Sequence, residues 1–440
     1  MAMKLGALLP IVKQKLQPLW QSCATATYGT RGRSPRKIDR AGWFTVRMQE
    51  LAKVAPRPTG AGEMFQLLRD GRPRTRADLA TVTGQSRSTI AARVDVLLAS
   101  GLVSPSGEAS STGGRPPSTF RFNPAARVVL AVDLGATHAR LAVTDLAGDV
   151  LAEHAEPIAI ADGPGAVLGR VVELGRDLLA EAERPVEDLA SIGVGLPGPV
   201  EHSSGRPINP PIMPGWDDAD VPGILGDALH VPVLVDNDVN IMALGEHRTQ
   251  WASVDHLLFV KVATGIGAGI ISDGSLRRGA QGSAGDVGHI AVPGGSDRPC
   301  RCGNTGCLEA VASGPAIATE LAEHGVAASD GADVVALVRA GDLEASRAVR
   351  EAGRRIGGVL AACVSLLNPS VIVIGGQVAE AGEHLIAGIR EVVYRRSLPL
   401  ATQHLRIAAS RTMGRAGVLG ASAMAADHVL SAAAIDSLIA

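Results

Sequence analysis

The feature that most constrains the fold is a pattern that occurs twice, in which an apolar strand, a glycine turn and a second strand follow one another. The first copy is residues 128–153 (VVLAVDLGATHARLAVTDLAGDVLAE), and the second is residues 256–279 (HLLFVKVATGIGAGIISDGSLRRG). Apolar runs bounded by glycine and Asp-Gly or Gly-Asp turns are typical of β-hairpins. Two similar halves of this kind predict a duplicated α/β domain whose two lobes enclose a cleft.

Further helices and strands are expected between and after the two copies. Apolar residues at helical spacing predict helices over residues 166–183, 315–324 and 345–367. Short apolar runs predict strands over residues 191–195, 233–235 and 370–374. A chain of 440 residues is also long enough for two or three domains.

The charge of the chain is divided unevenly. The formal net charge is −2, but residues 1–125 carry 19 Lys+Arg and 7 Asp+Glu, whereas the remainder carries 23 and 37. A basic first part joined to an acidic body predicts a polyanion-binding module attached to a globular one. Residues 1–60 lack periodicity and are rich in Arg, Lys, Ser and Pro, so a disordered basic tail is expected there.

Residues 61–122 have the pattern of a winged helix-turn-helix. Leu79 lies in a short predicted helix, Gly84 supplies a turn with positive φ, and Ser86 is the expected N-cap of the next helix. That second helix has an apolar face at helical spacing, formed by Ile90, Val94 and Leu97. A plain helical hairpin is the alternative.

The segment that follows, SPSGEASSTGGRPPSTFRF, predicts a turn-rich ribbon that ends in a strand. Such a ribbon forms the wing of a winged helix, and its tip can reach a minor groove or a phosphate. A solvent-exposed loop is the alternative. The residues expected to contact DNA lie on the outer face of the second helix and at the wing tip: Arg87, Ser88, Thr89, Arg93 and Arg115.

Glycines end predicted strands at three places, residues 133–137, 263–267 and 374–376. At the first two places a glycine turn lets backbone N–H groups approach phosphate oxygens because no Cβ stands in the way, and the third is a candidate floor for a nucleotide base and ribose. None of the three is a Walker P-loop. Each could instead be an ordinary turn between neighbouring elements.

Polar residues also end the strand in VDNDVNIMALGEH, residues 235–247. Asp236, Asn237 and Asp238 come directly before a helix. A carboxylate at such a place in a cleft is a candidate general base, and a helix N-cap is the alternative. The Pro/Gly-rich loop of residues 195–216 is a candidate wall of a small-ligand pocket.

Three of the five cysteines lie together in CRCGNTGCLE, with His289 upstream, in the spacing H-x10-C-x-C-x4-C. One histidine and three thiolates are a complete tetrahedral set for structural zinc, with no open position for water. The alternatives are free thiols, or a disulfide from Cys302 to Cys300 or Cys307. Cys23 and Cys363 lie apart from the group.

The segment GDVGHIAV…CRCGNTGCLEAVAS resembles the zinc signature of the ROK family (repressors, open reading frames and sugar kinases), and the resemblance covers about residues 62–425. It implies a duplicated actin-like, hexokinase-like α/β fold, preceded in the repressor branch by a winged helix. The expected domains are therefore a disordered basic tail (1–60), a winged helix-turn-helix (61–122) and a two-lobed ROK domain (128–430) with a zinc loop (289–307).

The resemblance also implies the site residues. The zinc ligands are His289, Cys300, Cys302 and Cys307. The sugar site, in which Asp238 matches the catalytic base of the kinases, is Asn237, Asp238, Asp286, His289 and Glu309. The nucleotide-binding residues are Asp133, Gly135, Thr137, Thr264, Gly265, Gly267, Gly375 and Gly376.

Three residues depart from the family's pattern. The first phosphate motif is usually DIGGTK, and here Ala136 and His138 replace glycine and lysine. The methyl group of Ala136 lies where a phosphate would approach. Asp286 replaces a glutamate of the sugar site and is one methylene shorter.

The favoured function is a sugar-responsive transcriptional regulator, expected to be a repressor. Its expected partners are operator DNA, a sugar or sugar phosphate, and a second copy of the chain in a homodimer or tetramer, with structural Zn²⁺. The alternative is a sugar kinase that uses ATP and Mg²⁺, with Asp238 as base. No apolar run is long enough for a membrane span, and the few cysteines favour the cytoplasm.

Overall fold

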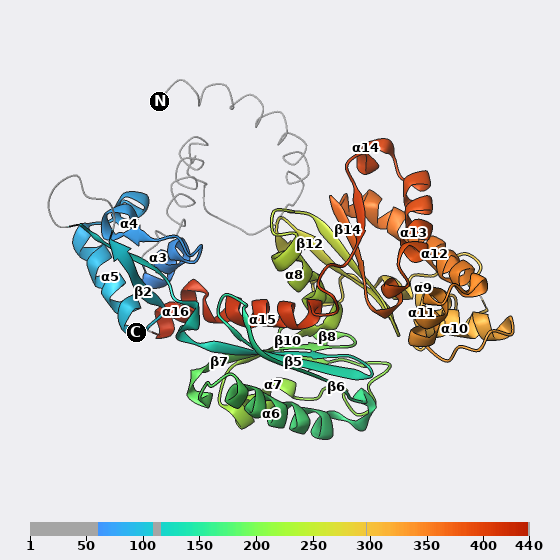
Figure 1. Cartoon of the computed structure of the whole chain (residues 1–440), viewed down its shortest axis with the longest axis horizontal. Coiled ribbons are helices and arrows are strands. Elements are labelled where there is room, and N and C mark those ends of the chain that lie inside the picture. Colours follow the sequence, from blue (N-terminus) through green and yellow to red (C-terminus); the bar gives the residue numbers. More distant parts are fainter. Residues whose placement is uncertain (1–59, 109–115, 296, 439–440) are drawn as a thin grey trace, which may run out of the picture. The chain divides into compact units, whose positions relative to one another are not determined.

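The computed structural model describes residues 60–108, 116–295 and 297–438 (Figure 1). The chain divides into two units, Met1–Thr59 and Gly60–Ala440, and the second is described here. The predicted basic tail, apart from residue 60, and Arg115 at the predicted wing tip lie outside the described residues.

The first part of this unit contains three helices and a small antiparallel sheet of strand order β1-β3-β2. The elements are α3 (Ala61–Leu68), β1 (Arg74–Thr75), α4 (Arg76–Thr83), α5 (Arg87–Ala99), β2 (Val103–Glu108) and β3 (Ser118–Phe122). The predicted turn between α4 and α5 is confirmed, since Gly84 has a φ of 68° and the Ser86 hydroxyl accepts a hydrogen bond from the Thr89 amide. Ile90, Val94 and Leu97 are fully buried, as their spacing predicted.

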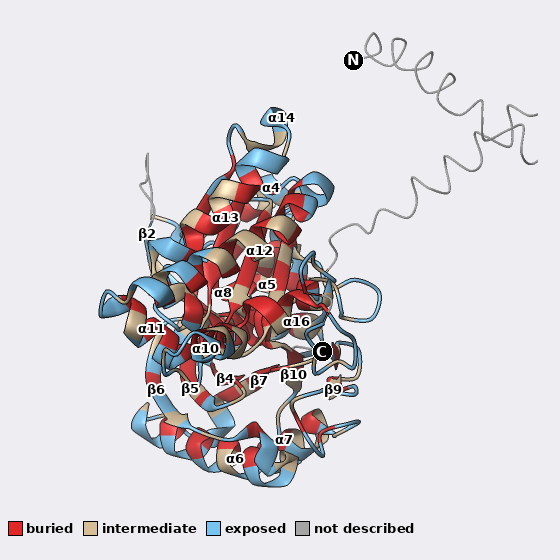
Figure 2. Ribbon diagram, turned by 90° about the vertical axis from the view of Figure 1, so that its right-hand side faces the viewer, coloured by how far each residue is buried: buried red, intermediate tan, exposed pale blue. Residues whose placement is uncertain are grey.

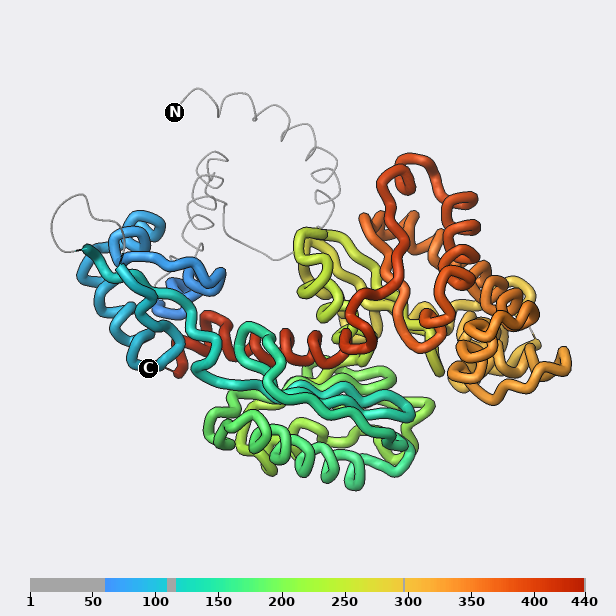
Figure 3. Tube along the Cα trace, viewed as in Figure 1, coloured from blue at the N-terminus to red at the C-terminus, as the bar shows by residue number. Residues whose placement is uncertain are grey.

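The next part is a five-stranded sheet of order β10-β7-β4-β5-β6. Its elements are β4 (Val128–Leu134), β5 (His138–Asp145), β6 (Val150–Pro157), α6 (Pro164–Glu181), β7 (Leu189–Leu196), α7 (Val221–Leu229) and β10 (Val233–Asn237), with the short pair β8 (Val200–Glu201) and β9 (Arg206–Pro207). Strands β4, β5 and β6 are antiparallel, whereas β7 and β10 run parallel to β4. Helices α6 and α7 cover one face of this sheet (Figure 3).

A second five-stranded sheet, of order β13-β12-β11-β14-β15, repeats this topology. Its strands are β11 (Leu257–Val262), β12 (Ile266–Ser272), β13 (Ser275–Leu276), β14 (Val371–Gly375) and β15 (Arg406–Ala409). In this sheet too, the first three strands along the chain form an antiparallel meander. The two later strands, β14 and β15, lie on the other side of β11 and run parallel to it. The predicted duplication is thereby confirmed.

The remaining helices of the described residues lie after β10, and most of them belong to this second lobe. They are α8 (Asp238–Gln250), α9 (Leu308–Ala312), α10 (Gly314–Glu323), α11 (Gly331–Arg339), α12 (Leu343–Leu367), α13 (Glu383–Arg396), α14 (Pro399–Thr402), α15 (Ala416–Val429) and α16 (Ala432–Leu438), with the 3-10 turn η4 (Val287–His289). The predicted helices over residues 166–183, 315–324 and 345–367 are α6, α10 and α12, with ends that differ by one or two residues.

Two helices, α8 and α15, lie between the two sheets. Helix α15 packs against β4 and β7 of the first sheet, and α8 packs against β11 and β12 of the second. Glycines allow the two helices to meet, because a Cβ on Gly245 would lie 2.1 Å from the Ala416 carbonyl oxygen and one on Gly420 would lie 1.7 Å from that of Ile241. Because α8 begins where β10 ends, this contact fixes the position of Asp238.

Each lobe has its own apolar core. Strands β4 and β7 are buried along most of their length, whereas the outer surface of α6 is exposed (Figure 2). Among the described residues no single helix is long and apolar enough to cross a bilayer. The bent pair α15–α16 meets that test only when its two helices are taken together, and much of α15 is buried in the protein.

Candidate functional site

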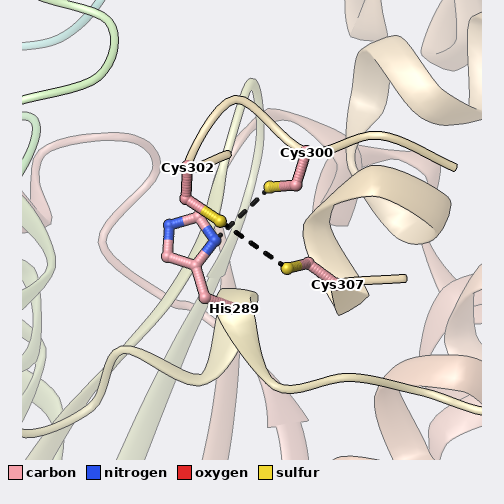
Figure 4. A group of neighbouring side chains, drawn as sticks. All are labelled: His289, Cys300, Cys302 and Cys307. Carbon is pink, nitrogen blue, oxygen red and sulfur yellow. Dashed lines mark hydrogen bonds between the residues drawn. The ribbon is translucent and has the colours of Figure 1, made fainter. Parts of the chain in front are cut away.

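The predicted metal ligands meet at one point. His289 ends η4, Cys307 precedes α9, and Cys300 and Cys302 lie in the loop between them. All four side chains point toward one another, and their donor atoms lie within 4.8 Å (Figure 4). The loop is closed by backbone pairing of Ala291 with Cys307 and of Pro299 with Thr305.

The distances between these donors fit a tetrahedral ion. Cys302 Sγ and Cys307 Sγ are 3.7 Å apart, and His289 Nδ1 and Cys300 Sγ are 3.5 Å apart. Two sulfurs at about 2.3 Å from a shared ion are separated by about 3.8 Å at the tetrahedral angle, and a sulfur and a nitrogen by about 3.5 Å. None of the described cysteines forms a disulfide. Burial raises the pKa of Cys307, so its thiolate needs a cation close by.

Two carboxylates, Asp286 and Glu309, flank the metal loop on either side. The Glu309 carboxylate accepts a hydrogen bond from the Ile266 amide at 3.1 Å, and a Cβ on Gly265 would lie 2.7 Å from it. Asp286 Oδ1 is 3.9 Å from His289 Nε2, the ring nitrogen that does not face Cys300. His289 can therefore orient toward both the metal and Asp286, as metal-bound histidines usually do.

Asn237 and Asp238 lie at the junction of β10 and α8. Asn237 is the N-cap of α8, because its side-chain oxygen accepts hydrogen bonds from the Val239 and Asn240 amides, while its amide group donates to the Gly198 carbonyl. Asp238 is the first residue of the helix and is 4% exposed. The alternative of an N-cap aspartate is wrong, because Asn237 is the N-cap, and the Asp238 carboxylate is left free for another partner.

That partner is Lys261, which the sequence reasoning missed. Lys261 Nζ donates to Asp238 Oδ2 at 2.5 Å. The available signal was that Lys261 is the one charged residue in the otherwise apolar strand β11. Arg278, also missed, pairs with the buried Asp236, whose other oxygen accepts from the side chain of Asn240.

Asp133 lies on β4 close to the Asp238–Lys261 pair. It is 7% exposed, and burial raises its pKa from 3.8 to about 6; Lys261 opposes this rise and Asp238 adds to it. Next to it, the first glycine turn is in contact with a side chain, because a Cβ on Gly135 would lie 2.1 Å from Cε1 of His138. Thr137 is exposed at the same turn. The His138 imidazole, absent from the family's pattern, therefore covers one side of that turn.

The remaining predicted nucleotide-binding residues also lie at strand ends. Thr264 and Gly265 form the turn between β11 and β12, and Gly267 lies on β12 against Val239 of α8. Gly375 is paired with Lys261 in the sheet and packs on Phe259, while Gly376 has a φ of 85°. The strand ends of both lobes thus face the region of Asp238 and Lys261, and a nucleotide-binding role for these glycines stays a prediction.

The predicted DNA-contacting residues on α5 lie on its outer side. Arg87 and Ser88 are exposed, whereas Thr89 and Arg93 are partly buried, and Arg93 contacts Gln85. Arg76 of α4 forms an ion pair with Asp95 of α5 at 2.6 Å. The exposed first turn of α5 therefore presents a cation and hydroxyl groups.

The helices of residues 60–122 are joined to the end of the chain. Asp427 of α15 pairs with Arg69, which follows α3, and with Arg248 of α8. The Gly62 amide donates to Asp436 Oδ1 at 2.8 Å, and the Gln66 side chain donates to the Leu430 carbonyl at 2.7 Å. Helix α8 therefore has Asp238 at one end and a link to α3 at the other.

Comparisons with known proteins agree with this architecture. The model of the ROK family matches residues 129–428. A xylose repressor from Caldicellulosiruptor bescii is 29% identical over 84% of this chain and 95% of its own, and a glucokinase from Halalkalibacterium halodurans is 32% identical over 67% of this chain and 93% of its own. A crystal structure of a ROK family transcriptional regulator, a homologue of the Escherichia coli MLC protein, superposes with a TM-score of 0.74 at 26% identity, over 87% of this chain and 98% of the other.

Proposed function

The chain belongs to the ROK family, and on that premise we propose that it is a sugar-responsive, DNA-binding transcriptional regulator that acts as a repressor. One observation carries the proposal. The model of the ROK family covers about two thirds of this chain. The match with the xylose repressor covers 84% of the chain, so it must extend beyond the family model. The match with the glucokinase covers 67% of the chain and need not extend beyond it. Residues 60–122, which a kinase does not require, make up most of the described part outside that span.

We propose that residues 60–122 form a winged helix-turn-helix. Helices α4 and α5, joined at Gly84, provide the helix-turn-helix, and β2 and β3 provide the wing. The exposed first turn of α5, with Arg87 and Ser88, would enter the major groove, since the N-terminal residues of a recognition helix contact base edges. Two such heads in a homodimer would bind a palindromic operator. An operator-bound regulator acts in the cytoplasm.

The proposed sugar site lies between the metal loop and the start of α8. Carboxylates accept hydrogen bonds from sugar hydroxyls, and Asp238, Asp286 and Glu309 supply three of them. A structural Zn²⁺ held by His289 and the three cysteines would fix the loop that carries Glu309. The sugar shifts the chain toward a state with different DNA affinity, because it contacts Asn237 at the end of β10 in the first lobe as well as the carboxylates of the second lobe.

The test is operator binding by the full-length, zinc-loaded protein. Fluorescence anisotropy with DNA from upstream of its own gene is measured with and without a panel of sugars. We expect selective binding that one sugar weakens, and that sugar should lose its effect in Glu309→Gln while DNA binding in its absence is unchanged. Binding without any sequence preference would overturn the proposal.

The second candidate is ATP-dependent phosphorylation of a hexose, which the glucokinase relative and the retained Asp238 favour. In that reaction Asp238 would accept the proton of the attacking hydroxyl. A coupled assay of ADP release across hexoses tests it, with Asp238→Asn as the control. Sugar-dependent release that is lost in the variant would support the kinase, and release equal in both would exclude it.

A further inference from the structure

Three charged side chains are buried together where the two lobes face each other. Asp238 begins α8, Lys261 lies on β11 of the second lobe, and Asp133 lies on β4 of the first. The side chains of Asp238 and Lys261 are 5% and 16% exposed, and their ion pair spans 2.5 Å. Asp133 helps to raise the pKa of Lys261, and both Lys261 and Asp238 affect the pKa of Asp133. A lysine therefore lies within a group of two carboxylates.

This lysine remains charged despite its burial. Burial by itself lowers the pKa of a lysine, but Asp238 and Asp133 outweigh it and raise the pKa of Lys261 above its ordinary value. A buried cation is stable only when carboxylates of this kind compensate it. The ammonium group thus supplies the positive charge that the two carboxylates require.

In sites that transfer phosphoryl groups, that charge is supplied differently. Carboxylates hold Mg²⁺, and the ion in turn binds the phosphate oxygens of the nucleotide. A divalent ion cannot bind Asp238 Oδ2 while an ammonium lies 2.5 Å from the same atom, because the two cations would repel each other in a region with little water. The paired oxygen is also not free to accept a proton from a hydroxyl, whereas Oδ1 can still accept a hydrogen bond from one.

We propose that the ammonium group of Lys261 takes the place beside Asp238 that a divalent cation would require, so that the site binds an uncharged sugar without magnesium nucleotide and without phosphoryl transfer. The statement about the sugar rests on the proposed function, but the exclusion of the metal does not. The residues present therefore do not fit the ATP and Mg²⁺ that the fold implies.

The experiment measures Mn²⁺ binding by electron paramagnetic resonance, with full-length protein whose metal loop is loaded with zinc. Lys261→Met removes the charge and keeps an unbranched stem, and Lys261→Arg keeps the charge. We expect the affinity of Lys261→Met for Mn²⁺ to exceed that of the wild type by at least about tenfold, because the substitution removes a positive charge a few ångströms from the ion. Lys261→Arg should behave as the wild type, and Asp238→Asn added to Lys261→Met should abolish the gain.

The wild-type protein provides a test that does not depend on any variant. It should show no stabilisation by Mn²⁺ with a non-hydrolysable ATP analogue in a thermal-shift assay, and the sugar response should persist in a chelator that leaves the zinc in place. Wild-type binding of the Mn²⁺ nucleotide, or a well-folded Lys261→Met without increased Mn²⁺ affinity, would overturn the inference. If no sugar changes operator binding while the metal results hold, the proposed function fails and the exclusion of the metal stands.

Discussion

Replacement of Asp133 by asparagine is expected to stabilise the protein at neutral and alkaline pH. Asparagine has nearly the shape of a protonated aspartate, so it removes the cost of burying an ionised carboxylate and keeps the packing against Gly417, whose Cβ position lies 1.9 Å from Asp133 Oδ2. A pKa that rises from 3.8 to about 6 on folding corresponds to about 3 kcal/mol at about 1.4 kcal/mol per pKa unit. This cost falls on the wild type alone.

The sign follows from proton binding. Between pH 3.8 and about 6 the unfolded chain has lost the Asp133 proton while the folded protein keeps it. The contribution of Asp133 to stability therefore decreases as the pH rises through this window, and below it the two proteins should differ little. About half of the total, or about 1.5 kcal/mol, is expected to appear between pH 5 and pH 8.

The assay is urea unfolding followed by far-UV circular dichroism, at several pH values between 5 and 8 and at fixed ionic strength. Asp145→Asn is the matched control, because Asp145 is a buried aspartate on the neighbouring strand whose carboxylate accepts hydrogen bonds from the Ala147 and Asp149 amides. That variant should lose stability. A difference between Asp133→Asn and the wild type that does not change with pH would refute the reasoning.

Three further substitutions test other parts of the chain. Cys302→Ser removes one of four donors, so the zinc content by mass spectrometry should fall and protease should cleave the loop of residues 289–307 faster. Asp427→Asn breaks the ion pairs with Arg69 and Arg248, and because these groups are each about a third or more exposed, the loss of stability should be only about 1 kcal/mol. Arg87→Ala should weaken operator binding and reduce its salt slope by about one, without changing the unfolding midpoint.

Each of these has an outcome that would contradict it. Full zinc retention in Cys302→Ser would remove that cysteine from the ligand set. We expect Asp427→Asn to have the same unfolding curve as the double variant Arg69→Gln/Arg248→Gln. If the stability losses of these two variants were additive when combined, Asp427 would not join the two arginines. An unchanged salt slope in Arg87→Ala would place Arg87 away from the DNA phosphates.

The sequence was sufficient for elements whose signals are local. Glycine turns after apolar runs placed β4, β5, β11 and β12, and the helical spacing of Ile90, Val94 and Leu97 identified the buried face of α5. The four metal-binding candidates were identified because they lie within 19 residues and their spacing suits one ion. In each case the residues that interact are neighbours along the chain or repeat with a period set by the backbone.

The partner of Asp238 was not accessible in this way. Lys261 is 23 residues further along the chain and lies on β11, the first strand of the second sheet, so no local period connects the two. Gly267 matched a phosphate motif and Gly375 the adenosine segment, yet in the structure the absence of a Cβ at these positions also provides room for Val239 and Phe259. Which contact a small residue makes depends on what the fold places against it.

By itself, then, the sequence determined the repeated strand pattern, the turn and caps of the N-terminal helices, and the donor set of the metal loop, because backbone geometry and short-range spacing specify these features. Only the tertiary structure decided that a lysine neutralises the buried carboxylate of Asp238 and that Asp427 joins α3 to α8, although Arg69 and Asp427 are 358 residues apart. Such pairs form when packing of the two sheets and of α8 against α15 brings distant side chains together, and burial then makes an unpaired charge too costly to remain.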